Sequence, residues 1–359
     1  MPFSILEPET GTPGVIGRQR RHGLELGLIV LLVCCLGCRG DSVGSGWTAQ
    51  ELGTDAEFKD VFFLDSERGW IVGGGHPVEG GIVGSTVDGG RTWSFSSGLI
   101  RGQTRPESVH LRAVQFLDEH RGFIVGSAGY VLRTVDGGEH WHPVHRGGRH
   151  LADLQFVDLQ TGWAVGGSTL IRTEDGGDTW ASPMPGGSEL PFSARAIQFL
   201  DRDRGWGVGV GGAIYGTTDG GESWSQLIET RSGEPGLWAL RFVDTERGWV
   251  VGEGGTILRT EDGGQTWSRQ ETPTSSFLTG VHFLDPTTGW AAGFDRSDSS
   301  SVILHTQDGG STWRVQLPIE GQALFALAFT ESGFGWAAGE RVRPHPQRLF
   351  RYAGPSGTR

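Results

Sequence analysis

The chain has 359 residues and a formal net charge of −12, with 42 acidic residues against 30 lysines and arginines. This balance argues against a general nucleic-acid binder, because no overall positive field is available to replace the counterions of a phosphate backbone, although a local basic patch is compatible with it. All three cysteines (Cys34, Cys35 and Cys38) lie near the N-terminus, so the 321 residues after Cys38 can form no disulfide, thiolate metal site or thiolate nucleophile.

The N-terminal segment has the pattern of an export signal. A basic cluster at residues 18–22 precedes an apolar run at 26–37, which is shorter than the roughly 20 residues of a membrane-spanning helix. The small residues before Cys38 resemble a bacterial lipobox, in which Cys38 is the acylated residue. Cys35 departs from that pattern, which prefers leucine. An ordinary signal peptide cleaved nearby and a start codon placed too early are the alternatives, and residues 19–21 (Gln-Arg-Arg) weakly match a twin-arginine signal.

We therefore predict that residues 1–44 are a signal peptide, lipobox and polar tether. The protein is expected to be exported and held in a membrane by a lipid anchor, facing the periplasm or the cell surface. Stable attachment would require the full lipid modification of Cys38, because one acyl chain anchors only marginally.

A short motif, T-x-D-G-G-x-[TSH]-W, occurs six times. Its aspartates are Asp88, Asp136, Asp175, Asp219, Asp262 and Asp308. They are separated by 48, 39, 44, 43 and 46 residues, and periods of this size indicate a solenoid, a propeller or an array.

A second motif recurs with the same period. Seven Gly-Trp or Gly-Phe pairs each follow an apolar run such as residues 61–65, and each is followed by two short alternating segments. The repeat unit is therefore read as four short strands, with tight turns at D-x-x-x-G and at D-G-G. Short strands with glycine and aromatic markers in every unit predict an all-β fold, a seven-bladed β-propeller with four antiparallel strands per blade.

The two motif counts predict how the ring closes. The seventh unit, residues 322–352, has three strands and then the chain ends, whereas residues 46–51 resemble an outer strand with Trp47 at the tryptophan position. We expect the N-terminal strand to complete the last blade, which removes exposed sheet edges. The propeller is expected to span 45–353, with a C-terminal tail at 354–359.

The repeated aspartate is interpreted as a structural residue. Its carboxylate can accept hydrogen bonds from the backbone N–H groups that follow, and the second glycine permits a left-handed conformation. Six copies spread around a ring cannot converge on one substrate. Calcium binding is the alternative, but each turn supplies only one or two carboxylates where that ion needs several oxygen ligands. No metal and no cofactor are expected.

These residues carry a resemblance to a known family. T-x-D-G-G-x-T-W matches the Asp-box, or bacterial neuraminidase repeat. The longer unit, F-x-D-x-x-x-G-W-x-V-G followed by G-x-I-x-x-T-x-D-G-G-x-T-W, resembles the photosystem II stability/assembly factors over roughly residues 45 to 352. The resemblance implies a seven-bladed propeller, often exported and lipid-anchored, that engages a membrane protein through an arginine-rich patch.

An enzyme is not expected. Sialidases share the Asp-box, but they have six blades and need three arginines and a tyrosine nucleophile with a glutamate partner. The three tyrosines here (Tyr130, Tyr215 and Tyr352) have no recognisable glutamate partner. Nucleophile-elbow, zinc-protease and phosphate-loop motifs are also lacking. A glycan-binding or sialidase-like surface protein is the alternative function.

The predicted binding face carries the loops between second and third strands and between blades, because these vary most in length. We expect a basic arc there on blades 7, 1 and 2. Its residues are Lys59, Arg101, Arg105, Arg112, Arg146, Arg149, Arg341 and Arg343. The alternative is that these are ordinary solvated cations of a lysine-poor protein.

Trp238 is the only tryptophan outside the repeat pattern, at the start of the first strand of blade 5. Packing near the axis and an apolar rim that helps to dock a peptide are the two interpretations. The sequence as a whole predicts a non-enzymatic, monomeric binding scaffold for an unidentified envelope or membrane protein.

Overall fold

The computed structural model describes residues 46–75, 78–97, 110–228 and 233–354. These residues form strands and turns, with four short 3-10 segments at Ser127–Gly129, Pro185–Gly187, Val210–Gly212 and Glu253–Gly255. Among the described residues, no helix combines the length and apolar character needed to cross a bilayer. The predicted leader, including Cys38, lies outside the described residues.

The strands form seven antiparallel sheets, which are the predicted blades. Blade 1 contains β2 (Phe58–Phe63), β3 (Gly69–Gly75), β4 (Val78–Thr86) and β5 (Ser94–Ser97). Blade 2 contains β6 (Leu111–Phe116), β7 (Gly122–Gly126), β8 (Val131–Thr134) and β9 (His142–His145). Blade 3 contains β10 (Asp153–Phe156), β11 (Gly162–Gly166) and β12 (Thr169–Thr173).

The second half repeats the pattern. Blade 4 contains β13 (Ala194–Phe199), β14 (Gly205–Gly209), β15 (Ile214–Thr217) and β16 (Ser225–Gln226). Blade 5 contains β17 (Leu237–Phe242), β18 (Gly248–Gly252), β19 (Ile257–Thr260) and β20 (Ser268–Arg269). Blade 6 contains β21 (Phe277–Phe283), β22 (Gly289–Phe294), β23 (Ser300–Thr306) and β24 (Arg314–Glu320). Blade 7 contains β25 (Gln322–Phe329), β26 (Gly335–Arg341) and β27 (Arg348–Tyr352), joined by β1 (Trp47–Glu51).

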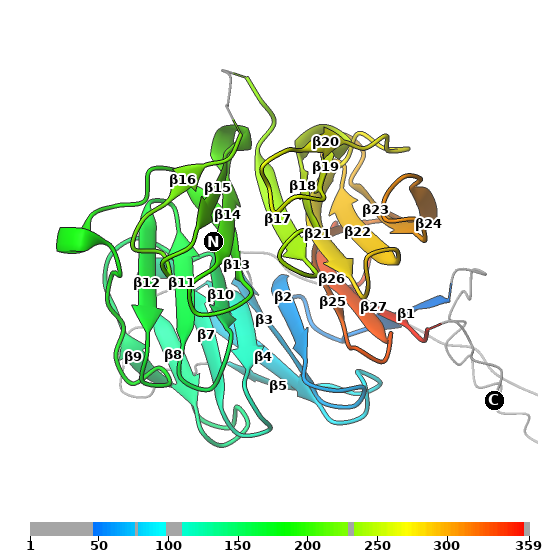
Figure 1. Ribbon diagram of the computed structural model, residues 1–359. Coiled ribbons are helices and arrows are strands. Elements are labelled where there is room, and N and C mark those ends of the chain that lie inside the picture. Colours follow the sequence, from blue (N-terminus) through cyan, green and yellow to red (C-terminus); the bar gives the residue numbers. More distant parts are fainter. Residues whose placement is uncertain (1–45, 76–77, 98–109, 229–232, 355–359) are drawn as a thin grey trace, which may run out of the picture. The chain divides into compact units, whose positions relative to one another are not determined.

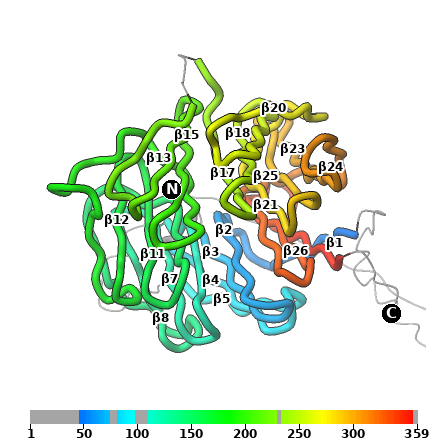
Figure 2. Tube along the Cα trace, in the orientation of Figure 1, coloured from blue at the N-terminus to red at the C-terminus, as the bar shows by residue number. Residues whose placement is uncertain are grey.

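The ring closes as predicted. Strand β1 pairs antiparallel with β27, from Trp47 opposite Tyr352 to Glu51 opposite Arg348. The first strand of each blade contacts the first strand of the next, and β25 contacts β2. Figures 1 and 2 show the blue β2 beside the red and orange strands of blade 7. The seven-bladed propeller closed by its N-terminal strand is therefore confirmed.

Blade 3 departs locally from four full strands. Its outer edge is a single bridge between Arg172 and Ala181, where the other blades have a strand. The segment after Ala181 contains Pro183 and Pro185. Proline has no backbone N–H to donate to a sheet, so Pro183 and Pro185 each remove one donor from this segment, whereas the outer strands β9 and β24 contain one proline each.

The core lies between blades, where an aromatic ring of each second strand stacks on the first-strand phenylalanine of the next blade. Trp70 lies 3.5 Å from Phe116 between ring centroids, with the planes only 8° apart. The closing contact, Trp336 on Phe63, has the same form. The other stacked pairs are Phe123–Phe156, Trp163–Phe199, Trp206–Phe242, Trp249–Phe283 and Trp290–Phe329. Burial of these large rings is the main apolar contribution that holds the ring together.

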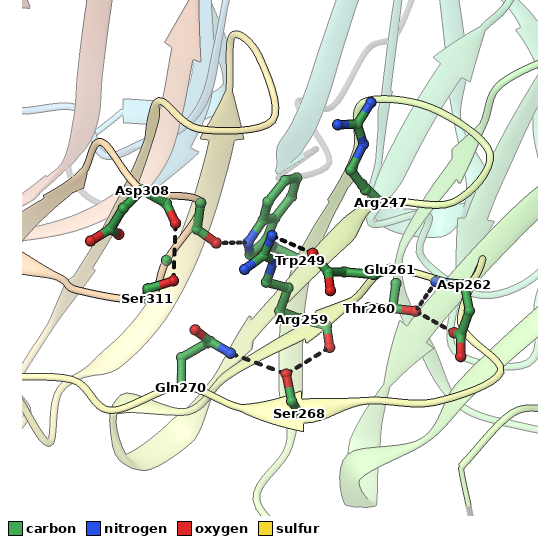
Figure 3. A network of polar contacts seen from close by, with 12 residues as sticks. Arg247, Trp249, Arg259, Thr260, Glu261, Asp262, Ser268, Gln270, Asp308 and Ser311 are labelled. Atoms are coloured by element: carbon green, nitrogen blue, oxygen red, sulfur yellow. Dashed lines mark hydrogen bonds and ion pairs between the residues drawn. The ribbon is translucent and has the colours of Figure 1, made fainter.

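The same indoles tie each blade to the next Asp-box. The Nε1–H of Trp249 donates to the carbonyl of Gly309 at 2.9 Å, in the turn that carries Asp308 (Figure 3). Trp70, Trp163, Trp206 and Trp336 donate to the equivalent glycine carbonyls. The tryptophans of the second motif therefore join neighbouring blades through a hydrogen bond as well as through ring stacking.

Within each Asp-box the carboxylate is fully engaged by its own turn. In blade 5, Asp262 accepts from the Thr260 hydroxyl at 2.8 Å (Figure 3). It also accepts from the backbone N–H and the hydroxyl of Thr266, at 2.8 Å and 2.5 Å. These hydrogen bonds lower the pKa of Asp262 to about 2. The other five boxes repeat the arrangement, with His140 replacing the hydroxyl in blade 2.

Blade 7 has no Asp-box, and a glutamine replaces the missing carbonyl. Trp290 on β22 faces blade 7, and its Nε1–H donates to Oε1 of Gln316 at 2.8 Å. The Nε1–H of Trp47, on the closing strand, donates to the same oxygen at 2.9 Å. Gln316 on β24 therefore joins blade 6 to the strand that closes the ring.

We predict that Gln316→Leu lowers the free energy of unfolding by roughly 2 kcal/mol, because two buried indole N–H groups lose their shared acceptor. Urea unfolding followed by tryptophan fluorescence measures this change. Gln226→Leu is the control, because Gln226 lies exposed on the outer strand of blade 4 and accepts no indole N–H. Equal stability of the native protein and the Gln316 variant would contradict this role.

Candidate functional site

The site begins with a bulge that recurs near the start of the first strands. In six blades the pairing of the first and second strands skips one residue, as at Lys59 between Phe58 and Asp60. A bulge re-aims a side chain and is common beside functional sites. The skipped residues are Lys59, Arg112, Arg195, Trp238, Thr279 and Phe325.

All six skipped side chains line one central cavity. It has a volume of about 400 Å³, and the first strands of all seven blades contribute to its wall. We call the ring of six residues, which lies at the end of the channel where the first strands begin, the channel mouth. Its chemistry is basic and aromatic, with three cations, Trp238 and Phe325.

The three cations of the mouth are held differently. The ammonium of Lys59 pairs with Glu57 at 3.2 Å and Glu340 at 2.9 Å, and lies 4.0 Å from the ring centre of Phe325. The guanidinium of Arg195 lies 3.9 Å from the ring centre of Trp238 and 3.4 Å from a Glu253 oxygen.

Arg112 is the third cation. Its side chain is exposed at the mouth, and no ion pair joins it to another described residue. Arg112 and Arg195 are therefore the cations of the mouth that can meet a ligand with the smallest rearrangement.

Below the mouth, two aspartates join neighbouring first strands. Asp60 accepts from the backbone N–H of Val61 and, across to blade 2, from that of Val114, both at 2.9 Å. Asp153 makes the same two contacts, with Leu154 and with Ile197 of blade 4. Desolvation by the surrounding protein raises the pKa of Asp60 to about 7 and that of Asp153 to about 6.

Further along the channel, glutamines make a second set of links between blades. Gln115, Gln155 and Gln198 each donate to and accept from the backbone of the phenylalanine in the next first strand. Blades 5 and 6 have Arg241 and His282 at this level, and neither makes such a link among the described residues. Burial lowers the pKa of His282 well below its usual value, with the nearby charge of Arg241 adding to the effect.

The structure brings three of the predicted binding residues together at the mouth, Lys59, Arg112 and Trp238. Arg341 is already paired with Asp55 at 2.7 Å and is mostly covered. Arg146, Arg149 and Arg343 are exposed but lie outside the cavity wall. Arg101 and Arg105 lie outside the described residues.

Sequence reasoning missed Arg195 and Arg241. Their signal becomes visible when the seven first strands are aligned on their shared phenylalanine, which places Arg195 level with Lys59 and Arg241 level with Gln115. The basic residues of the channel therefore extend to blades 4 and 5, beyond the predicted arc on blades 7, 1 and 2.

One group of side chains has the composition of a metal site, Asp136, Glu139 and His140. Its geometry is explained by the Asp-box of blade 2, where the ring of His140 takes the place of the usual hydroxyl beside Asp136, at 2.8 Å. None of Tyr130, Tyr215 and Tyr352 lines the central cavity.

Fold and motifs together define a seven-bladed Asp-box propeller with a lined central channel. A family model described as "Photosynthesis system II assembly factor YCF48" matches residues 41–150, 144–239 and 232–327. The chain therefore belongs to this family, in agreement with the resemblance of its repeat unit.

Individual relatives agree. "Photosystem II assembly lipoprotein Ycf48" of Synechococcus sp. (strain CC9902) is 26% identical over 165 residues, 44% of this chain and 47% of the relative. The alignment thus spans about half the length of that relative.

Two solved structures share the fold. "YCF48 bound to D1 peptide" has a TM-score of 0.67 and 23% identity, covering 86% of this chain and 97% of the other. "YCF48 from Cyanidioschyzon merolae" has a TM-score of 0.68 and 19% identity, covering 85% and 98%.

The half-buried Asp60 gives a pH prediction for the channel wall. A carboxyl whose pKa is raised on folding, here from 3.8 to about 7, favours the folded state below pH 3.8 and loses that contribution as the pH rises through 7. The native protein should therefore lose melting temperature relative to Asp60→Asn by a few degrees, as an order of magnitude, between pH 5 and 8. Differential scanning calorimetry at both pH values measures it.

Asp118→Asn is the control for that experiment. Asp118 lies in an exposed turn, and its hydrogen bonds to Arg121 and His120 lower its pKa, so it is ionised throughout this range. The difference in melting temperature between Asp118→Asn and the native protein should not change with pH. An Asp60→Asn difference that is equally flat would show that burial does not perturb the carboxyl.

Proposed function

We propose that this protein is a non-enzymatic binding scaffold, which holds a segment of a membrane protein at the channel mouth. The observation that carries the proposal is the set of bulges, which turns Arg112, Arg195, a lysine and two aromatic rings toward one opening. Of the two arginines, only Arg195 is paired with a described carboxylate, that of Glu253. Cations and aromatic side chains around a concave site are typical of protein recognition.

Family membership supports this function and its cellular setting. A relative is named as an assembly lipoprotein, and a structure of another holds a D1 peptide. We infer that this chain also assists the assembly of a membrane protein complex, and that it is exported and anchored through Cys38. The partner would approach the face where the first strands begin, with its segment over the mouth.

Charge reversal tests the mouth. Arg112 and Arg195 are changed to glutamate together in the full-length chain, and membrane proteins are captured from detergent-solubilised membranes of the host and identified by mass spectrometry. The native protein should retain a specific membrane protein, and the variant should lose at least about tenfold of it, since two favourable charges become repulsive.

A matched control carries the same change of charge elsewhere. Arg269 and Arg314 are exposed on the outer strands β20 and β24, and their reversal to glutamate should leave capture unchanged. Equal capture by all three proteins would refute the mouth as the docking site. Capture of no membrane protein by the native chain would refute the scaffold function itself.

A further inference from the structure

The channel contains an arginine that the fold does not use. Arg241 on β17 lines the central cavity, and its Nε–H is buried without an acceptor. Among the described residues no hydrogen bond or ion pair engages its guanidinium. Burial lowers its pKa, as expected for a cation without a counterion.

Its position makes this arrangement unusual. At the same level in blades 2, 3 and 4 a glutamine amide donates one hydrogen bond to the next first strand and accepts one from it. Arg241 replaces such a link with a charge that the adjacent strand, which presents His282, does not neutralise. Buried polar groups in native proteins are nearly always paired, so an orphan at a cavity wall indicates a missing partner.

A second unpaired donor lies on the same strand. Trp238, one of the six mouth residues, lines the same cavity, and its Nε1–H is buried without an acceptor among the described residues. The two carboxylates of the channel wall, Asp60 and Asp153, lie on blades 1 and 3 and already accept two backbone N–H groups each. Neither forms an ion pair with Arg241.

From this geometry we propose that the central channel binds a carboxylate, which enters past Trp238 and pairs with the guanidinium of Arg241. A guanidinium presents two parallel N–H donors that match the two oxygens of a carboxylate. The cavity of about 400 Å³ is large enough for a small organic acid or for the last residues of a peptide. At the mouth Arg112, which forms no ion pair with another described residue, attracts the negative charge toward the opening, whereas Lys59 and Arg195 are already paired with glutamates.

Two kinds of ligand could supply this carboxylate, the C-terminus of a polypeptide chain and a free small acid. Only the first of these rests on the proposed function, since it would place the end of the bound segment in the channel. Three probes distinguish the sources: a short peptide with uncharged side chains and a free C-terminal carboxylate on alanine, the same peptide with an amidated C-terminus, and sodium acetate. Binding of each to the purified full-length chain is measured by isothermal titration calorimetry.

The free-acid peptide is expected to bind about tenfold or more tightly than its amide, because a charge-assisted pair is lost in the amide. Arg241→Gln introduces the residue type that blades 2 to 4 have at this level, and it should abolish this preference. Arg241→Lys should keep part of it. Acetate is tested both as a competitor of the peptide and alone. If it displaces the peptide, or if it binds to the native chain but not to Arg241→Gln, then a free small acid is sufficient for binding.

Arg247→Gln is the control, because Arg247 belongs to the same blade but pairs with Asp244 in an exposed turn. Thermal unfolding of each variant verifies that it is folded. The inference is overturned if acid and amide bind equally, if the preference survives in Arg241→Gln, or if no probe binds. Capture of a membrane protein together with any of these results would leave the scaffold function standing and remove only the carboxylate site.

Discussion

The structure depends on one contact, an aromatic ring of each second strand lying flat on the first-strand phenylalanine of the following blade. At the closing junction the pair is Trp336 and Phe63, so the last blade meets the first through the same contact as every other pair. Six of the seven aromatic rings are indoles, and each indole also donates its N–H to a neighbouring turn or to Gln316. The contact fixes both the separation of the blades and their register. It therefore holds the first strands in one ring around the axis.

A rigid ring explains why the channel can carry specific chemistry. The phenylalanines and aliphatic residues of the first strands face the neighbouring blades, whereas the bulged residues face the opening. The first group is nearly the same in every blade, and the second changes from lysine to tryptophan to threonine. The residues of the core and those of the proposed binding site are thus separated within a single strand, and the mouth can vary without disturbing the core.

The fold was predictable from the sequence because each repeated residue has one structural role. The glycine-tryptophan pairs and Asp-boxes recur with the blade, and Trp47 marks the strand that closes it. The shortened edge of blade 3 was not predicted, since it depends on two prolines outside the repeat motifs. The role of Gln316 also escaped sequence reasoning, because it replaces an Asp-box that the last blade lacks.

The candidate site was predicted less completely. Lys59 and Arg341 read as free cations in the sequence, but Glu340 and Asp55, distant along the chain from their partners, pair with them in the folded protein. Arg195 and Arg241 lie in ordinary apolar strands, and nothing local distinguishes them from surface arginines. The bulge brings Arg195 to the mouth and the closed ring places Arg241 in the same channel, and no sequence motif marks a bulge whose skipped residue varies among the blades.

The central claim is that a membrane protein segment lies over the channel mouth. Site-specific photocrosslinking tests it most directly, with benzoyl-phenylalanine introduced at Phe325 in the mouth or at Val315, which is exposed on the outer strand β24. Irradiation with host membranes should join a membrane protein to position 325 and leave position 315 free. Crosslinking from position 315 with none from 325 would place the partner on the outer edge of the propeller and contradict the account.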